Sequence, residues 1–134
     1  FQYNKTILSK MSEKTIPSAV VRTLTLKQAL DLAVEHHSAG ELSKAETVYQ
    51  NILHADSNQP VALHLLGVIA HQKGDYNQAV NLIERALVNE PNYDEAYSNL
   101  GLALQELGKR DEALASFKKA INNVRNFHKP QIPN

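Results

Sequence analysis

Bulky and small residues recur along this chain with a period of 34 residues. Gly40, Gly74 and Gly108 mark the period, and one pattern of residues surrounds each of them. Three aligned sets carry the pattern: Ala45, Ala79 and Ala113; Leu32, Leu66 and Leu100; and the bulky Tyr49, Ile83 and Phe117. A fixed period of this length is typical of stacked helix-turn-helix units. The pattern therefore predicts an all-α scaffold of repeated helical hairpins.

Three units follow from the period, at residues 26–59, 60–93 and 94–127, and each glycine divides its unit into two amphipathic helices. In the second unit one apolar face precedes the glycine and another follows it: Leu63, Leu66, Gly67 and Ala70, then Ala79, Ile83, Ala86 and Leu87. This spacing places each set on one side of a helix. We expect the two faces to meet. Gly67 and Gly101 would let the backbones approach closely, with Ile83 or Phe117 beside them.

Local signals agree with these boundaries. Thr25 and Gln28 have the spacing of a capping box at the start of the first unit. Pro60 suits the opening turn of a helix, and Pro91 is expected to end the second unit. The three turn glycines stand where a left-handed residue ends a helix.

Both ends of the chain depart from the repeat, and its size predicts a single domain. Residues 1–25 form an N-terminal segment with a short helix expected over residues 4–14, and residues 128–134 are expected to be a linker or tail. Because no amphipathic helix follows the third unit, we expect apolar surface near Leu114, Ala115, Phe117 and Ile121 to remain uncovered. One terminal segment would then dock on such an end surface or in a groove, of its own or a neighbouring copy, and a weak homo-oligomer is a further expectation.

The amino-acid composition argues against several classes of function. The chain has 14 basic and 14 acidic residues, so no global field favours nucleic acid or an anionic membrane. The sequence contains no cysteine, which removes thiolate chemistry and cysteine-zinc sites. The sequence contains no apolar run of the roughly 18 to 20 residues that a membrane span needs. Charged residues interrupt any apolar stretch near the N-terminus, so we expect no signal peptide and a cytoplasmic location.

The second unit, with Leu66, Gly67, Gly74, Ala79 and Pro91 in order, resembles the tetratricopeptide repeat family. The third unit follows the same pattern but has Arg125 where the proline would stand, and the first is the most degenerate. The resemblance implies a right-handed superhelical stack of three units that binds a protein or peptide and performs no catalysis.

A narrower resemblance lies in the sequence of residues 34–40, of Ala45 and Glu46, and of residues 61–72. These stretches are similar to repeats that precede glycosyltransferase, methyltransferase or sulfotransferase domains in bacterial proteins, in the general style of the O-linked N-acetylglucosamine transferase. The alternative function is therefore the substrate-recognition arm of a larger bacterial transferase. A self-assembly module is a third hypothesis.

The family resemblance also implies that the first helix of each unit lines a concave groove, and it implies which residues of that helix face the groove. These positions hold Lys27, Leu30, Asp31, Val34, His37 and Ser38; then Val61, His64, Leu65, Val68, His71 and Gln72; then Glu95, Ser98, Asn99, Leu102, Gln105 and Glu106. The apolar members would supply burial for a peptide, unless a terminal segment or a neighbouring helix covers them.

Two groove chemistries known in the family fit these positions poorly. The clamp for an acidic chaperone C-terminus needs lysine, arginine and asparagine, but its matching sites hold Leu30, Val34, Leu65 and Glu95, with only Asn99 retained. The backbone-binding asparagine ladder of the glycosyltransferase-type repeats likewise reads Asp31, Leu65 and Asn99.

Metal binding and catalysis gain no support from the sequence. His64 and His71 are two turns apart, too far for easy ligation of one metal, and His36 falls on a core-facing site. The chain carries neither a nucleophile-elbow motif nor a phosphate-binding loop. We therefore expect no cofactor, no metal and no catalytic residue.

Overall fold

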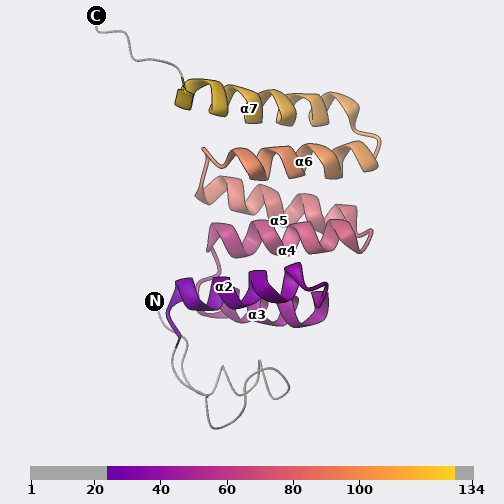
Figure 1. The fold of residues 1–134 in the computed structure, drawn as a ribbon. Helices are drawn as coiled ribbons and strands as arrows, with labels where there is room; N and C mark the ends of the chain where they lie inside the picture. The colour runs from indigo at the N-terminus through magenta and orange to yellow at the C-terminus, as the bar shows by residue number, and fades with distance from the viewer. Residues whose placement is uncertain (1–23, 129–134) are drawn as a thin grey trace, which may run out of the picture. The chain divides into compact units, whose positions relative to one another are not determined.

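The computed structural model describes residues 24–128, which form six helices and no strand (Figure 1). Their bounds are α2 Leu26–Ser38, α3 Leu42–Ala55, α4 Pro60–Gln72, α5 Tyr76–Asn89, α6 Asp94–Glu106 and α7 Arg110–His128. The prediction of an all-α chain built from helical hairpins is confirmed for these residues. The helix expected over residues 4–14 and the tail after His128 lie outside them.

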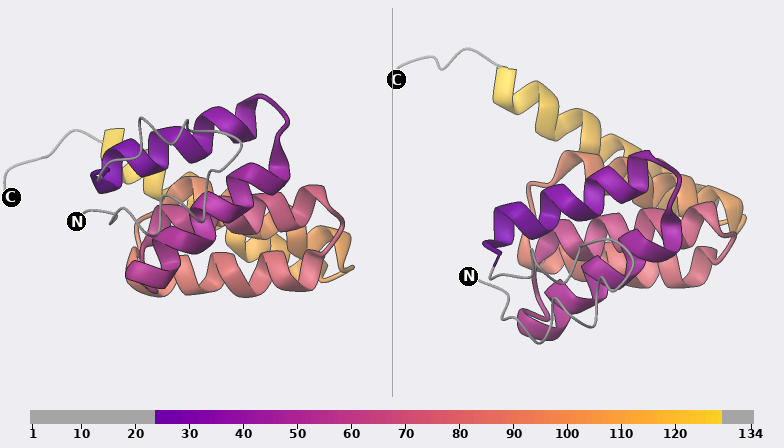
Figure 2. Two further views of the ribbon diagram at one scale, coloured as in Figure 1. Left: turned by 90° about the horizontal axis from the view of Figure 1, so that it is seen from below. Right: turned by 60° about the horizontal axis from the view of Figure 1, so that its bottom comes forward.

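The chain divides into two compact units, Phe1–Leu66 and Gly67–Asn134, and the division falls inside α4. In the first unit α2 and α3 run antiparallel about a tight turn and pack against each other (Figure 2). Alanines and bulky side chains both contribute to the buried side of this hairpin. The buried residues of the two helices are Ala29, Ala33 and His36 from α2, and Ala45, Val48, Tyr49 and Ile52 from α3.

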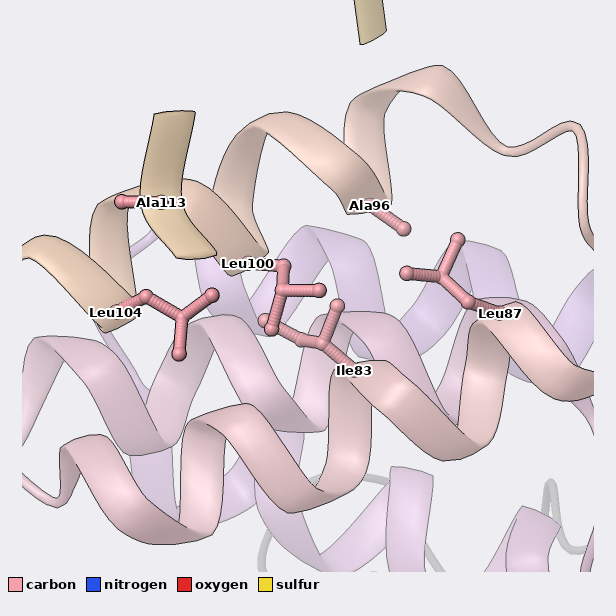
Figure 3. Close-up of a cluster of buried hydrophobic side chains, with 6 residues drawn as sticks. All are labelled: Ile83, Leu87, Ala96, Leu100, Leu104 and Ala113. Atoms are coloured by element: carbon pink, nitrogen blue, oxygen red, sulfur yellow. The ribbon is translucent and has the colours of Figure 1, made fainter. Parts of the chain in front are cut away.

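In the second unit α6 packs against both α5 and α7. Its core is a cluster of buried side chains from these three helices, shown in Figure 3: Ile83, Leu87, Ala96, Leu100, Leu104 and Ala113. Tyr93, Tyr97, Val80 and Phe117 are partly buried against the cluster. This core fixes one side of α6, so the other side of that helix remains available for contacts.

The turn after each first helix has one geometry, repeated three times. Gly40, Gly74 and Gly108 have φ angles of 79°, 82° and 76°, and they are the only residues with positive φ in the described part of the chain. At Gly40 the glycine N–H donates to the His37 carbonyl at 3.0 Å, and the next N–H, that of Glu41, donates to the His36 carbonyl at 2.9 Å. This pair of bonds is a Schellman motif, which glycine adopts without the steric cost of a side chain. The predicted left-handed turns are confirmed.

The predicted helix boundaries are also confirmed at several points. Thr25 and Gln28 form both bonds of the capping box, at 3.1 Å and 2.9 Å. Pro60 is the first residue of α4, and Pro91 follows the last residue of α5 by two positions. The third unit lacks that proline, since Arg125 stands there. Accordingly α7 has 19 residues, whereas α5 has 14.

Two helix pairs approach so closely that glycine is needed at the contact. A Cβ atom added to Gly67 would lie 2.7 Å from Cγ1 of Ile83 and 3.3 Å from the Ala79 carbonyl oxygen. A Cβ atom on Gly101 would lie 2.5 Å from the ring of Phe117. The predicted close approach at both glycines is confirmed.

We expect Gly67→Leu to lower the free energy of unfolding by about 1 to 3 kcal/mol, because the added side chain overpacks the contact with Ile83. Urea denaturation followed by circular dichroism measures the loss. The matched control is the double variant with Ile83→Ala, which makes room for the new leucine. Its cost should be smaller than the sum of the two single costs. Strict additivity would show that the two residues do not share this contact.

Candidate peptide-binding surfaces

The outer side of α6 carries the most exposed of the predicted groove residues in the second unit. Burial of Ala96, Leu100 and Leu104 in the core turns the opposite side of the helix to solvent. Glu95, Leu102, Gln105 and Glu106 are exposed there, and Ser98 and Asn99 are half-buried. These side chains form one surface, which we call the α6 face.

The second half of α4 contributes three more predicted residues to the same unit. Val68 and His71 are half-buried, and Gln72 is exposed. The His71 ring stands edge-on to Tyr76, with 5.2 Å between the ring centroids. Its buried Nε2 makes no hydrogen bond to the described residues. The Tyr76 contact therefore gives His71 a packing role within its own unit.

In the first unit the predicted residues differ in accessibility. Lys27, Asp31 and Val34 are exposed, whereas Leu30 and His37 are half-buried on α2. Leu65 is half-buried on α4. The Lys27 ammonium donates a hydrogen bond to the Asp31 carboxylate at 2.8 Å, and this bond raises the pKa of Lys27. The two charges largely neutralise each other.

His64 does not belong to an accessible surface, so its predicted role as a peptide contact is wrong. Its side chain is 1% exposed. Burial lowers the pKa of His64 to about 4, because the charged imidazolium loses its hydration. His64 therefore remains neutral at pH 7 and is part of the protein interior.

His36 is buried as predicted, with 8% of its surface exposed. Its Nδ1 lies 3.3 Å from Oε1 of Glu41, and the Lys44 ammonium donates to the other oxygen of the same carboxylate at 2.6 Å. These two partners, Lys44 foremost, hold the pKa of Glu41 below its usual range. The sequence analysis missed this link across the turn, although Glu41 and Lys44 have the three-residue spacing of a helical ion pair. Across residues 24–128 no three His, Asp or Glu side chains gather in a way that would hold a metal ion.

One repeat position is apolar in all three first helices and keeps solvent contact in each. Val34 is 43% exposed and Leu102 is 45% exposed. Val68, which stands between them in the sequence, is half-buried. The three residues are 34 positions apart. An apolar side chain thus recurs on the outer side of α2, α4 and α6.

Comparison with known families identifies the repeats in part of the chain. A family profile described as TPR repeat matches residues 67–108, and one described as tetratricopeptide repeat matches residues 94–125. Residues 67–125 of the chain are thus tetratricopeptide repeats. The profiles cover most of the second unit and most of the third. The first unit, predicted as the most degenerate, is supported by the α2–α3 hairpin and its glycine turn.

Several solved structures share the fold. MamA is 25% identical with a TM-score of 0.71, and the match covers 78% of this chain and 61% of that chain. The Sgt2 TPR domain from Aspergillus fumigatus is 25% identical with a TM-score of 0.70, covering 75% and 66%. The second TPR of Spaghetti (RPAP3), described as bound to the HSP90 peptide SRMEEVD, is 20% identical with a TM-score of 0.67, covering 70% and 87%. Comparison with curated protein sequences gives no match.

None of the helices between residues 24 and 128 has both the length and the apolar character that a bilayer span requires. The expectation of a cytoplasmic location stays a prediction.

Acidification should destabilise the protein through His64. The folded-state pKa of about 4 lies below the unfolded-state value of about 6.5, so the folded state binds fewer protons between these pH values. The stability contributed by neutral His64 is complete above pH 6.5 and falls by about 3 kcal/mol as the pH drops from 7 to 4. Urea denaturation at both pH values measures this change.

The control for this experiment is His64→Leu, which removes the titrating group and keeps an apolar side chain. The difference between the two proteins should grow in favour of the variant as the pH falls. An equal pH dependence in both would contradict the burial of a neutral His64.

Proposed function

We propose that this chain is a non-catalytic scaffold that binds a protein or peptide, with the α6 face as a principal contact surface. The observation that carries the proposal is Leu102, an apolar side chain that is 45% exposed in the middle of that face. The recurrence of an apolar side chain with solvent contact every 34 residues, at Val34, Val68 and Leu102, supports it. Single exposed apolar residues are ordinary, but one that recurs with the repeat is not random scatter.

The surroundings of Leu102 suit a peptide ligand. Asn99 lies one turn before it, and Gln105 and Glu106 lie one turn after it, on the same side of α6. Amides offer both donors and acceptors, which can orient a peptide backbone, while Leu102 supplies apolar burial. The surface therefore combines a central apolar contact with polar groups around it.

Charge on the α6 face favours a neutral or basic ligand. Glu95 and Glu106 are both exposed there, and no lysine, arginine or histidine lies within α6. An acidic peptide would meet like charges along the helix. A peptide with lysine or arginine next to an apolar residue would match both features of the surface.

Peptides can be selected from a displayed library for binding to the whole chain. We expect their affinity to depend on Leu102. We expect Leu102→Asp to weaken their binding by about tenfold or more, because the apolar contact is lost. Asn99→Ala should give a smaller loss. Isothermal titration calorimetry measures both.

The matched control for Leu102→Asp is Val88→Asp, which changes an exposed valine on α5, 80% of whose surface is in contact with solvent. Selected peptides should bind this variant as they bind the parent chain. Equal binding to the Leu102 variant, or a library that yields no binder, would contradict the proposal.

The peptide SRMEEVD offers a negative test. RPAP3 is described as bound to it, but the matching groove positions of this chain hold no lysine or arginine to bind the three side-chain carboxylates and the terminal carboxylate of the peptide. We expect no saturable binding to the whole chain in fluorescence anisotropy at low salt. Tight binding that weakens with added salt would show that basic groups elsewhere on the chain form a clamp.

The transferase-arm hypothesis is a narrower form of the same binding function. MamA, Sgt2 and RPAP3 are not described as transferases, so they do not favour it. The gene sequence downstream of this chain tests it directly. A catalytic domain encoded there would support it, and the absence of one would reject it.

A further inference from the structure

Two acidic residues lie toward opposite ends of the α6 face, with one apolar residue between them. Glu95 is seven residues before Leu102, and Glu106 is four residues after it. All three are exposed, and residues four and seven apart share one side of a helix. At about 1.5 Å per residue, Glu95 and Glu106 lie roughly 10 Å and 6 Å from Leu102 along the helix axis. Their two carboxylates are therefore well separated on one surface.

Neither glutamate is paired with a positive charge. Within residues 24–128, Glu95 and Glu106 take part in no ion pair. The first basic residues after α6, Lys109 and Arg110, come after the turn at Gly108. A ligand with a basic group opposite each carboxylate would form charge-assisted hydrogen bonds at both ends of the face. The separation of the two glutamates thus sets the spacing of basic groups in a matching ligand.

The α6 face suits an extended peptide better than a helix. A helix buries a continuous apolar stripe at its contacts, whereas Leu102 is the single exposed apolar residue of α6. The backbone N–H and C=O groups of an extended peptide also need hydrogen-bond partners, and those in the middle of a helix do not. Ser98 and Gln105, which are seven residues apart on one side of α6, offer such partners along the face.

We propose that the α6 face binds an extended partner peptide in which two basic residues, five positions apart, flank an apolar residue. This ligand class rests on the function proposed above, because it specifies what the same surface binds. An extended chain advances about 3.3 Å per residue, so three residues cover roughly 10 Å and two cover roughly 7 Å. These lengths match the distances of Glu95 and Glu106 from Leu102. The long stem of lysine lets its charged end reach a carboxylate although successive side chains alternate in direction.

The chain's own N-terminal segment is a less suitable occupant. Lys5 and Lys10 are five positions apart and have apolar residues between them. However, the apolar pattern of this segment predicts a helix over residues 4–14, which lie outside the described part of the chain. In a helix these lysines are about 7.5 Å apart along the axis, roughly half the separation of Glu95 and Glu106. The distances therefore favour a partner peptide.

The test compares peptides that differ only in the order of their residues. The probes are GGKSTLSKGG and GGKSLTSKGG, which cover both directions of binding, and the control is GGKKSTLSGG, which has the same composition with adjacent lysines. NMR titration of the isotope-labelled whole chain at low salt measures affinity and locates the contact. We expect at least one probe to bind saturably at α6, about threefold or more tightly than the control, because the control loses one charge pair. Added salt should reduce this preference.

Variants of the two glutamates test the charge pairs directly. Glu95→Gln and Glu106→Gln should each weaken probe binding by about threefold, and the double variant should bind probe and control equally. The matched control is Glu84→Gln, which removes the charge of an exposed glutamate on α5 and should leave binding unchanged. All these positions are exposed, so circular dichroism should show that the variants remain folded. Probe binding that both α6 variants leave unchanged would overturn the proposal.

The Leu102→Asp variant separates this proposal from the function proposed above. If library-selected peptides depend on Leu102 but neither probe binds better than the control, the spacing is wrong and the α6 face remains a binding surface. If Leu102→Asp leaves all peptide binding unchanged, both proposals fail.

Two other occupants would also overturn the choice of a partner peptide. Probe binding that appears only after deletion of residues 1–23 would identify the N-terminal segment. A dimer of the whole chain in light scattering that the probe dissociates would identify a second copy. A monomer that binds the probe with residues 1–23 in place supports a partner peptide.

Discussion

Close contact between helices at glycine is the constraint on which the rest of the second unit depends. Gly67 faces Ile83, and Gly101 faces Phe117, at distances that leave no room for a side chain. Van der Waals attraction between such surfaces is individually small but adds up over many atom pairs. Because these contacts set how near the helices lie, they also fix which side of α6 is buried and which side carries Leu102.

The glycines in turns and the glycines at helix contacts have different structural roles. Gly74 has empty space around its α-carbon but needs a positive φ, whereas Gly67 has ordinary helical geometry but no space. Substitution at the first strains a turn, and substitution at the second forces two helices apart. Residues of one type, repeated at one period, thus encode both the ends of the helices and the distance between them.

The sequence predicted the fold well because its signals are local and repeat three times. The capping box at Thr25 and the start of α4 at Pro60 depend on neighbouring residues alone. His64 could not be placed in this way. The family resemblance placed it in the groove, at the repeat position of Leu30 and Ser98, and these two residues do keep solvent contact. No local pattern reports its burial, and the assignment of the remaining surface residues to a ligand stays a prediction.

The missing proline at position 125 has a geometric consequence for the chain beyond the repeats. Without it α7 continues five residues past Asn123, the repeat counterpart of the last residue of α5. At about 1.5 Å per residue, this extension projects roughly 7 Å further along the helix axis. It also turns the exit direction of the backbone by more than a third of a revolution, because each residue rotates the chain by about 100°. The longer α7 thus shifts and turns the point at which the chain leaves the repeats.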